Sequence, residues 1–224
     1  MRRRRWLVGL ALLAVTAGTA VGIDSIANST RPAAESNGKG AVATTSACGI
    51  TAAGIRILQN GQTVYREPGH VVHPNGGPPA QVRCSGGSIW VVWPFQGAGM
   101  SQEAYFGVHS GDGGRTWHPV FTEPFFGRKA PHAFDAYLGP WTLRGPRDAY
   151  FVGTCPACSV GLLQGTVSLW VTKDGGGTFR EYKVPTLTGY EPTRLRVARG
   201  AATIDAKGFE HNVAKHKAAT VRVG

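Results

Sequence analysis

Three arginines stand at similar places in a repeated stretch of this sequence, and guanidinium groups are suited to bind anions. Arg83 lies in QVRC, Arg144 in TLRG and Arg196 in RLRV, at offsets of 61 and 52 residues. Guanidinium groups bind carboxylates through paired hydrogen bonds. If the strands that carry them surround a common axis, the three side chains would converge on one anion site. The alternative is that a repeat reuses a surface arginine, because charged side chains are normally solvated.

Four cysteines could carry redox or structural chemistry: Cys48, Cys84, Cys155 and Cys158. An even number in an exported protein suggests disulfides. We favour Cys48–Cys84 with Cys155–Cys158, because a Cys-Pro-Ala-Cys segment readily closes a short loop. A redox pair of this spacing usually begins a helix, which lowers the thiol pKa. Here the segment follows the strand-like AYFVG, so a structural disulfide is the favoured interpretation.

The sequence does not indicate a metal or cofactor site. The seven histidines are scattered, and His70 and His73 in one Pro/Gly-rich loop are the best zinc candidates. No second pair of ligands has the spacing that tetrahedral zinc needs. Neither a phosphate-binding loop nor a G-x-S-x-G elbow is present. We therefore predict no metal, no cofactor and no complete catalytic constellation.

Two eight-residue segments, SGDGGRTW at 110–117 and TKDGGGTF at 172–179, have the same pattern. Ser, Thr and Asp side chains can bond the backbone N–H groups of a turn, and glycine adopts angles that other residues resist. The aromatic residue then begins the next strand and packs into the core. We read both acids as turn-building residues, not catalytic acids. The structural positions are Ser110, Asp112, Gly114, Trp117, Thr172, Asp174, Gly176 and Phe179.

Both segments resemble the Asp box, S-x-D-x-G-x-T-W, with Thr for Ser and Phe for Trp in the second copy. Asp-box repeats occur in sialidases, sortilin-like receptors and photosystem assembly factors, which share β-propeller folds. The resemblance covers roughly 79–206. It implies an all-β fold, a β-propeller-like array of about three to four antiparallel blades. A closed propeller needs at least four blades, and 48–224 holds just under three repeats of 62 residues. Either the N-terminal hairpin helps to fill out a short, irregular propeller, or the array is incomplete and open.

A sialidase would need more than this pattern. That resemblance implies a tyrosine nucleophile with a nearby glutamate, an acid/base aspartate and an Arg-Ile-Pro segment. The nearest string, Gly54-Ile55-Arg56-Ile57, lacks the proline. Tyr105, Tyr137 and Tyr150 are present, but tyrosine in a strand is usually a core residue. No catalytic residue is therefore assigned.

The strands expected around these residues form hairpins. In GIRILQNGQTVYRE, Asn60-Gly61 predicts a tight turn between strands near 54–58 and 63–67. The copies that follow alternate short β-branched or aromatic runs with Gly-rich turns, giving about four strands each. A third copy begins at TRLRVARGAATIDAKG and ends near the C-terminus.

The N-terminal sequence predicts an export segment. Arg2–Arg5 precede an uncharged stretch from Trp6 to Ile23, so 1–23 is a signal peptide or an N-terminal membrane anchor. Residues 24–47 are small and polar, which predicts a flexible linker before the domain at 48–224. The positive-inside rule leaves the domain outside the cytoplasm, secreted or tethered by an uncleaved segment.

Charge is concentrated at the two ends of the chain. The formal net charge is +11, of which Arg2–Arg5 supply four. Residues 24–192 carry 13 basic against 11 acidic residues, and 193–224 carry 7 against 2. A basic end can attract phosphate, nucleic acid or an anionic wall polymer. We favour the simpler expectation that this end is a solvated, frayed tail.

Together these patterns predict an exported binding or scaffold module for an extracellular protein or glycan. The alternative is a sialidase-type glycoside hydrolase that acts on an anionic sugar. We expect no nucleic-acid partner, and contact with a membrane only through the N-terminal segment. A homo-oligomer is expected if the blade array is open, because open sheet edges invite pairing.

Overall fold

The computed structural model describes residues 43–46, 48–53, 56–66, 80–94, 105–122, 130–134, 137–154, 165–210 and 213–224. The chain divides into two units, 1–38 and 39–224, and every described residue belongs to the second. None of the described residues forms a helix of the length and hydrophobicity that crossing a membrane requires. The predicted export segment at 1–23 lies outside the described residues.

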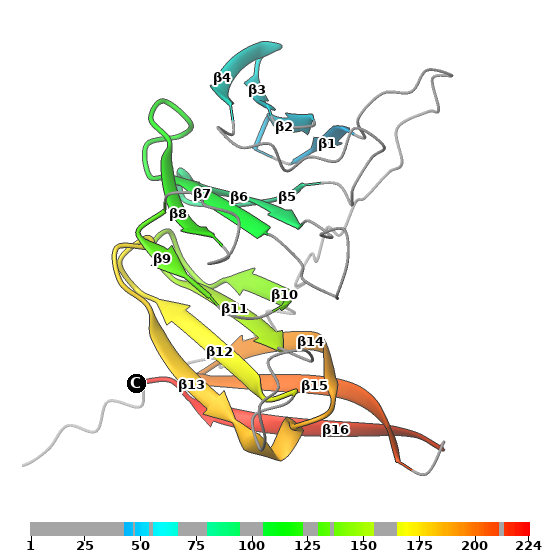
Figure 1. Cartoon of the computed structure of the whole chain (residues 1–224). Helices are drawn as coiled ribbons and strands as arrows, with labels where there is room; N and C mark the ends of the chain where they lie inside the picture. Colours follow the sequence, from blue (N-terminus) through cyan, green and yellow to red (C-terminus); the bar gives the residue numbers. More distant parts are fainter. Residues whose placement is uncertain are drawn as a thin grey trace, which may run out of the picture. The chain divides into compact units, whose positions relative to one another are not determined.

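The described residues form sixteen strands in four sheets that follow chain order (Figure 1). Sheet 1 holds β1 (Ala43–Thr45), β2 (Ile50–Ala53), β3 (Arg56–Gln59) and β4 (Gln62–Arg66). Sheet 2 holds β5 (Gln81–Ser85), β6 (Ser88–Pro94), β7 (Tyr105–Ser110), β8 (His118–Thr122) and β9 (His132–Ala133). Sheet 3 holds β10 (Tyr137–Leu143), β11 (Ala149–Thr154), β12 (Val167–Thr172) and β13 (Arg180–Val184). Sheet 4 holds β14 (Glu191–Ala198), β15 (Ala201–Glu210) and β16 (Val213–Arg222).

The predicted all-β fold is confirmed for this part of the chain. Neighbouring strands pair antiparallel, except that β8 and β9 are parallel. A single 3-10 turn, η1 (Pro185–Leu187), links β13 to β14. The sheets form an open array of blade-like units, as the repeat pattern predicted.

Three hydrophobic cores lie between the four sheets, one at each junction. Sheets 1 and 2 enclose a core that includes Ile50, Ile57 and Phe106. Sheets 2 and 3 enclose an aromatic core, and sheets 3 and 4 enclose a mainly aliphatic one. Burying one such side chain stabilises the fold by about 1.5–3 kcal/mol. The sheets are therefore held face to face, and not by backbone pairing between them.

This stacking explains why the middle strands are hydrophobic at successive positions. In β6, Ile89 and Val91 belong to the core shared with sheet 1, while Trp90 and Val92 belong to the core shared with sheet 3. Side chains alternate between the two faces of a strand. Runs such as IWVVW and AYFVG are thus the sequence pattern of strands that are buried on both faces.

The last sheet is buried on one face only, and its pattern alternates. In β15, Ala202, Ile204 and Ala206 are buried, while Thr203 and Asp205 between them are partly exposed. The described side chains of its outward face are charged, polar or alanine, so they offer little apolar surface for another sheet.

Two boundaries differ from the sequence-based predictions. Ala43–Thr45, placed in the flexible linker because of composition, pair with β2 as strand β1. The basic end predicted as a frayed tail is also wrong: β16 pairs with β15 from Val213 to Arg222. Composition did not reveal either strand, because antiparallel pairing uses backbone groups that every non-proline residue has.

Candidate functional site

The first glycine turn, Ser110–Trp117, joins β7 to β8 and uses its acid to organise its own backbone. Ser110 Oγ donates to Asp112 Oδ1 at 2.8 Å, and the N–H of Gly114 donates to Ser110 Oγ at 2.8 Å. The N–H groups of Arg115 and Thr116 donate to Asp112 Oδ1 at 3.0 and 2.9 Å. Thr116 Oγ1 donates to Asp112 Oδ2 at 2.7 Å. Both carboxylate oxygens are therefore occupied inside the turn.

The second glycine turn, Thr172–Phe179, joins β12 to β13 with the same connections. Thr172 Oγ1 donates to Asp174 Oδ1 at 2.7 Å, and the N–H of Gly176 donates to Thr172 Oγ1 at 2.8 Å. Thr178 donates to Asp174 twice, from its N–H at 3.0 Å and from its hydroxyl at 2.7 Å. Serine and threonine are equivalent here, because only the hydroxyl is used.

Electrostatics support the same role for both acids. Hydrogen bonds, first from the Thr116 hydroxyl and then from its N–H and from Ser110, lower the pKa of Asp112 well below its ordinary value. For Asp174, burial acts to raise the pKa, but hydrogen bonds from Thr178 and Thr172 outweigh it and the pKa is lowered. A carboxylic acid that donates a proton to a leaving group needs a raised pKa instead. Neither aspartate is suited to be a general acid.

Two of the candidate tyrosines lie in the cores. Tyr105 is buried in β7 and its hydroxyl donates to the carbonyl oxygen of Phe134. Tyr150 is buried in β11, where burial and then the charge of Asp148 raise the pKa of its hydroxyl. A nucleophilic tyrosine needs the opposite shift. The side chain of Tyr137 lies outside the described residues.

The three arginines lie on or next to the first strand of sheets 2, 3 and 4. Strand β5 lies beside β10, and β10 lies beside β14, so the structure brings these strands together. The guanidinium of Arg83 lies 4.8 Å from the ring centroid of Trp141 in β10. Arg196 Nη2 is paired with Asp205 Oδ1 at 3.0 Å. Two of the three cations thus have partners within the fold.

Strand register shows that Arg144 is not equivalent to Arg83. In sheet 2, the turn residue Ser110 pairs with Ile89, which pairs with Cys84. In sheet 3, the turn residue Thr172 pairs with Ala149, which pairs with Leu143. The residue before Leu143 is Thr142, so Thr142 occupies the position of Arg83. Arg144 lies two residues further along, at the position of Ser85. The 61-residue alignment was therefore wrong by two residues for Arg144. The hairpin of sheet 3 has one more turn residue than that of sheet 2, since Thr142 pairs with a residue eight positions later and Arg83 with one seven positions later. Arg196 does match Arg83, since each pairs across its hairpin with a residue seven positions later.

One of the two predicted disulfides is confirmed. Cys48 and Cys84 are bonded, with a Cα–Cα distance of 6.3 Å, and the bond links the start of sheet 1 to β5. Cys155 and Cys158 lie outside the described residues, and so do His70 and His73. Within the described residues, no three His, Cys, Asp or Glu side chains gather in a way that could hold a metal ion.

A histidine that the sequence did not single out lies at the junction of sheets 2 and 3. His109 Nε2 lies 2.7 Å from Ser88 Oγ, and its ring lies 4.6 Å from that of Trp90. Burial, and then the charge of His118, lower the pKa of His109 to about 4, although Asp112 acts in the opposite direction. Its only sequence signal was its place one residue before the first glycine turn.

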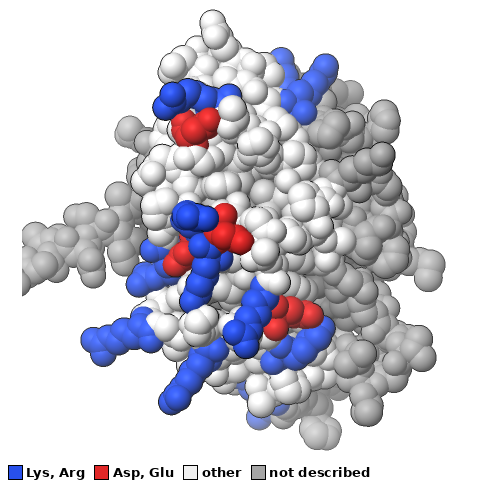
Figure 2. All heavy atoms as spheres, turned by 90° about the vertical axis from the view of Figure 1, so that its left-hand side faces the viewer, with Lys and Arg blue, Asp and Glu red and all other residues white. Residues whose placement is uncertain are grey.

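A second feature that the sequence analysis missed is the basic surface of sheet 4. Figure 2, a view of one side of the molecule, shows several Lys and Arg side chains over its lower part, with Asp and Glu side chains beside some of them. The seven basic residues of 193–224 were visible in the sequence, but only the strand pairing shows that Arg194, Arg196, Lys207 and Arg222 share the outward face of sheet 4.

Comparisons with protein families, curated proteins and solved structures found no match for this chain.

Proposed function

We propose that this protein is an extracytoplasmic binding module for a protein or glycan. The observation that carries the proposal is the use of Asp112 and Asp174: both carboxylates are bound within their own turns. These two acids therefore have a structural role in their turns, which leaves neither of them to serve as a catalytic acid of a hydrolase. The Asp-box resemblance supports the proposal, since a repeat fold can present binding surfaces without catalysis.

The disulfide supports the location. Cys48 and Cys84 are bonded, and disulfides persist in oxidising compartments outside the cytoplasm. This agrees with the export segment that the sequence predicts at 1–23. The glycosidase alternative gains no support from the tyrosines, because Tyr105 and Tyr150 are buried in cores.

The test combines binding and turnover in one preparation. The full-length protein, kept in a mild detergent, is applied to an array of neutral and acidic glycans and incubated with a fluorogenic sialoside. We expect binding to at least one class of glycan, or to an extracellular protein in a pull-down, with no release of fluorophore. Release that is lost in Tyr150→Phe but kept in Tyr182→Phe would establish the glycosidase instead.

A further inference from the structure

The outward face of sheet 4 carries charged side chains to which the proposed function assigns no ligand. Strand register places residues from all three strands on this side, opposite the core residues Val197, Ala202 and Ile204. We call it the sheet 4 face. Its described side chains are Glu191, Arg194, Arg196, Ala198, Ala201, Thr203, Asp205, Lys207, Ala214, His216, Ala218, Thr220 and Arg222.

These side chains form rows across the three strands. One row is Ala198, Ala201 and Arg222, and the next is Arg196, Thr203 and Thr220. The following rows are Arg194, Asp205, Ala218 and then Glu191, Lys207, His216. Rows on one face of a strand are about 6.6–6.8 Å apart, so the four rows span about 20 Å. A cation stands in every row.

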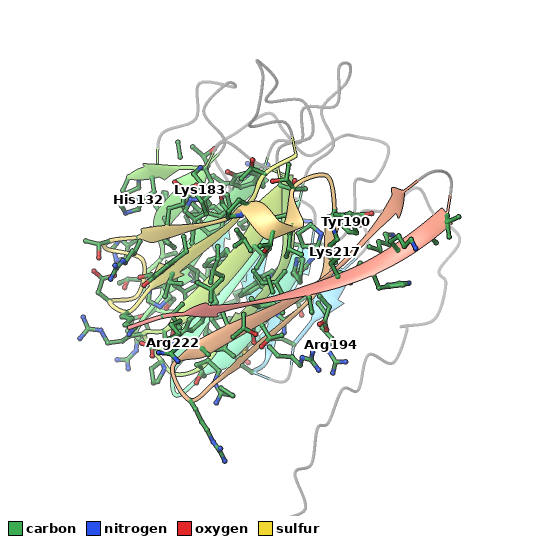
Figure 3. The ribbon with its side chains drawn as sticks, turned by 90° about the horizontal axis from the view of Figure 1, so that it is seen from below. His132, Lys183, Tyr190, Arg194, Lys217 and Arg222 are labelled. Carbon is green, nitrogen blue, oxygen red and sulfur yellow. A yellow bond between two sulfur atoms is a disulfide. The ribbon has the colours of Figure 1, made fainter. Side chains whose placement is uncertain are left out.

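The net charge of this face is positive, although acidic residues offset part of it. The basic residues are Arg194, Arg196, Lys207 and Arg222, and the acidic residues are Glu191 and Asp205. Two pairs neutralise each other: Arg196 with Asp205 at 3.0 Å and Lys207 with Glu191 at 3.2 Å. Arg194 and Arg222 form no ion pair with a described residue, and neither does Arg199 in the adjoining β14–β15 turn. All three are exposed, and Figure 3 shows Arg194 and Arg222 extending from different parts of the sheet.

The spaces between the cations are small and polar. Thr203 and Thr220 lie side by side, with their hydroxyl oxygens 3.3 Å apart, and alanines occupy four further positions of the face. Small side chains let a chain lie close to the strands, and threonine hydroxyls can both donate to and accept from sugar hydroxyls. The face therefore offers anion contacts at intervals with neutral hydrogen-bonding groups between them.

The same composition disfavours two other anionic partners. Proteins that bind single-stranded nucleic acid stack its bases on aromatic side chains. Apart from Phe209, whose side chain lies outside the described ones, the sheet 4 face carries no aromatic residue. Tyr190 nearby is buried, with Lys217 4.2 Å from its ring centroid (Figure 3). Proteins that lie on a bilayer insert apolar or aromatic side chains. Apart from Phe209, which pairs with Ala214 and whose side chain lies outside the described ones, the face carries only alanine as an apolar residue.

We propose that the sheet 4 face binds a linear acidic polysaccharide, with carboxylates on Arg194, Arg199 and Arg222 and sugar hydroxyls on Thr203 and Thr220. The inference rests on the proposed binding function and names the class of ligand for it. Guanidinium groups bind carboxylates through paired hydrogen bonds, and the contacts are exposed, so salt weakens them. The complex is therefore of moderate affinity and sensitive to ionic strength.

The experiment measures binding of the full-length protein in mild detergent to polygalacturonate at increasing KCl, with dextran as the neutral polymer. The face variant is Arg194→Gln, Arg199→Gln and Arg222→Gln together. The matched control, Arg56→Gln, Arg66→Gln and Arg147→Gln, removes three exposed arginines from sheet 1 and from the loop after β10, with the same change in net charge. Thermal melts check that both variants fold.

We expect wild type to bind polygalacturonate and not dextran, with affinity that falls as KCl rises. Three exposed charge contacts predict a roughly tenfold loss of affinity in the face variant and little change in the control. Equal losses in both variants, or none in the face variant, would overturn the site. Tighter binding to single-stranded DNA or to anionic vesicles would overturn the ligand class. If wild type does not bind polygalacturonate but binds another glycan or a protein, this inference is wrong while the proposed binding function stands. Release of fluorophore from the sialoside would instead contradict the proposed binding function.

Discussion

The two glycine turns have the same internal hydrogen bonds but face different surroundings. In each, the acid binds the N–H and hydroxyl of the threonine four residues later. Both turns also pack against the preceding sheet. The first contacts sheet 1 and the second contacts sheet 2. Comparing the two turns therefore separates the effect of the hydrogen bonds within the motif from the effect of packing against the neighbouring sheet.

The first turn packs against a polar and flexible side chain, that of Gln59. A Cβ added at Gly114 would lie 2.9 Å from Gln59 Oε1, at the end of a flexible side chain. Gln59 Nε2 also donates to the carbonyl oxygen of Gly113 at 3.0 Å. Trp117 packs beside Tyr65, with ring centroids 6.3 Å apart, and its Nε1 donates to the carbonyl oxygen of Gly114.

The second turn meets a rigid apolar surface. A Cβ added at Gly176 would lie 2.4 Å from Val120 Cγ1 and 3.0 Å from Trp90 Cη2. Phe179 belongs to the aromatic core, with its ring centroid 4.9 Å from that of Phe134. The same local motif is thus a surface contact in one place and part of a core junction in the other.

The comparison predicts its largest difference at the buried glycines. Gly114 and Gly176 both have φ near +93°, which strains any residue with a Cβ, so each alanine variant loses about 1–2 kcal/mol of unfolding free energy. Gly176→Ala also overpacks against Val120 and Trp90, and we expect a total loss of about 2–5 kcal/mol. Denaturant unfolding of both variants measures this. Equal losses would mean that the two surroundings do not differ in rigidity.

A smaller effect, alike in both turns, is expected at the acids. Asp112→Ala and Asp174→Ala each remove the acceptor of the turn and should lower the melting temperature by roughly 2–4 °C at neutral pH. Lys173→Ala, an exposed neighbour outside the network, is the matched control and should melt like wild type.

The pH dependence of this effect follows from the lowered pKa of both acids. Their stabilisation is present above the pKa of the unfolded chain, about 4, and is lost as pH falls through the folded pKa. The difference between wild type and each alanine variant should therefore shrink below about pH 4. Variants that melt like wild type at neutral pH would show that the turn networks add no stability.

The smallest expected effect is on the pH dependence of stability, and it comes from His109, which lies where the second turn packs against sheet 2. His109 lies beside Gly175, where an added Cβ would come within 2.9 Å of its Cε1, and its pKa is lowered to about 4, so the folded protein holds it neutral. The unfolded chain takes up a proton below about pH 6.5. Stability should thus fall as pH drops from about 6.5 to 4, because the unfolded state binds more protons.

His109→Gln keeps a group that can bond Ser88 but cannot titrate. Its melting temperature should depend less on pH in that window than that of wild type. His118→Gln, altered at the paired position in β8, tests whether the slope belongs to His109 alone. Identical slopes in wild type and His109→Gln would rule out His109 as the titrating group.

Local sequence signals were enough to predict the turns, the hairpins and one disulfide. The residues of each glycine turn bond mainly with one another, so their pattern can be read within eight positions. The Asn60-Gly61 turn joins β3 to β4 for the same reason, with both residues at positive φ. The continuous apolar runs of β6 and β11 indicated strands, and their burial on both faces explains the pattern.

The tertiary structure decided features that depend on residues far apart in the chain. Arg144 lies two positions from the equivalent of Arg83, and only the pairing of the strands reveals this. Arg196 is bound to Asp205, nine residues away on the next strand. Arg194, Arg196, Lys207 and Arg222 share one face only because β14, β15 and β16 pair in this register, which uses backbone groups that carry no sequence signature. Sequence alone therefore determined the local turns and the count of charges, while the pairing of distant strands decided which charges share a face.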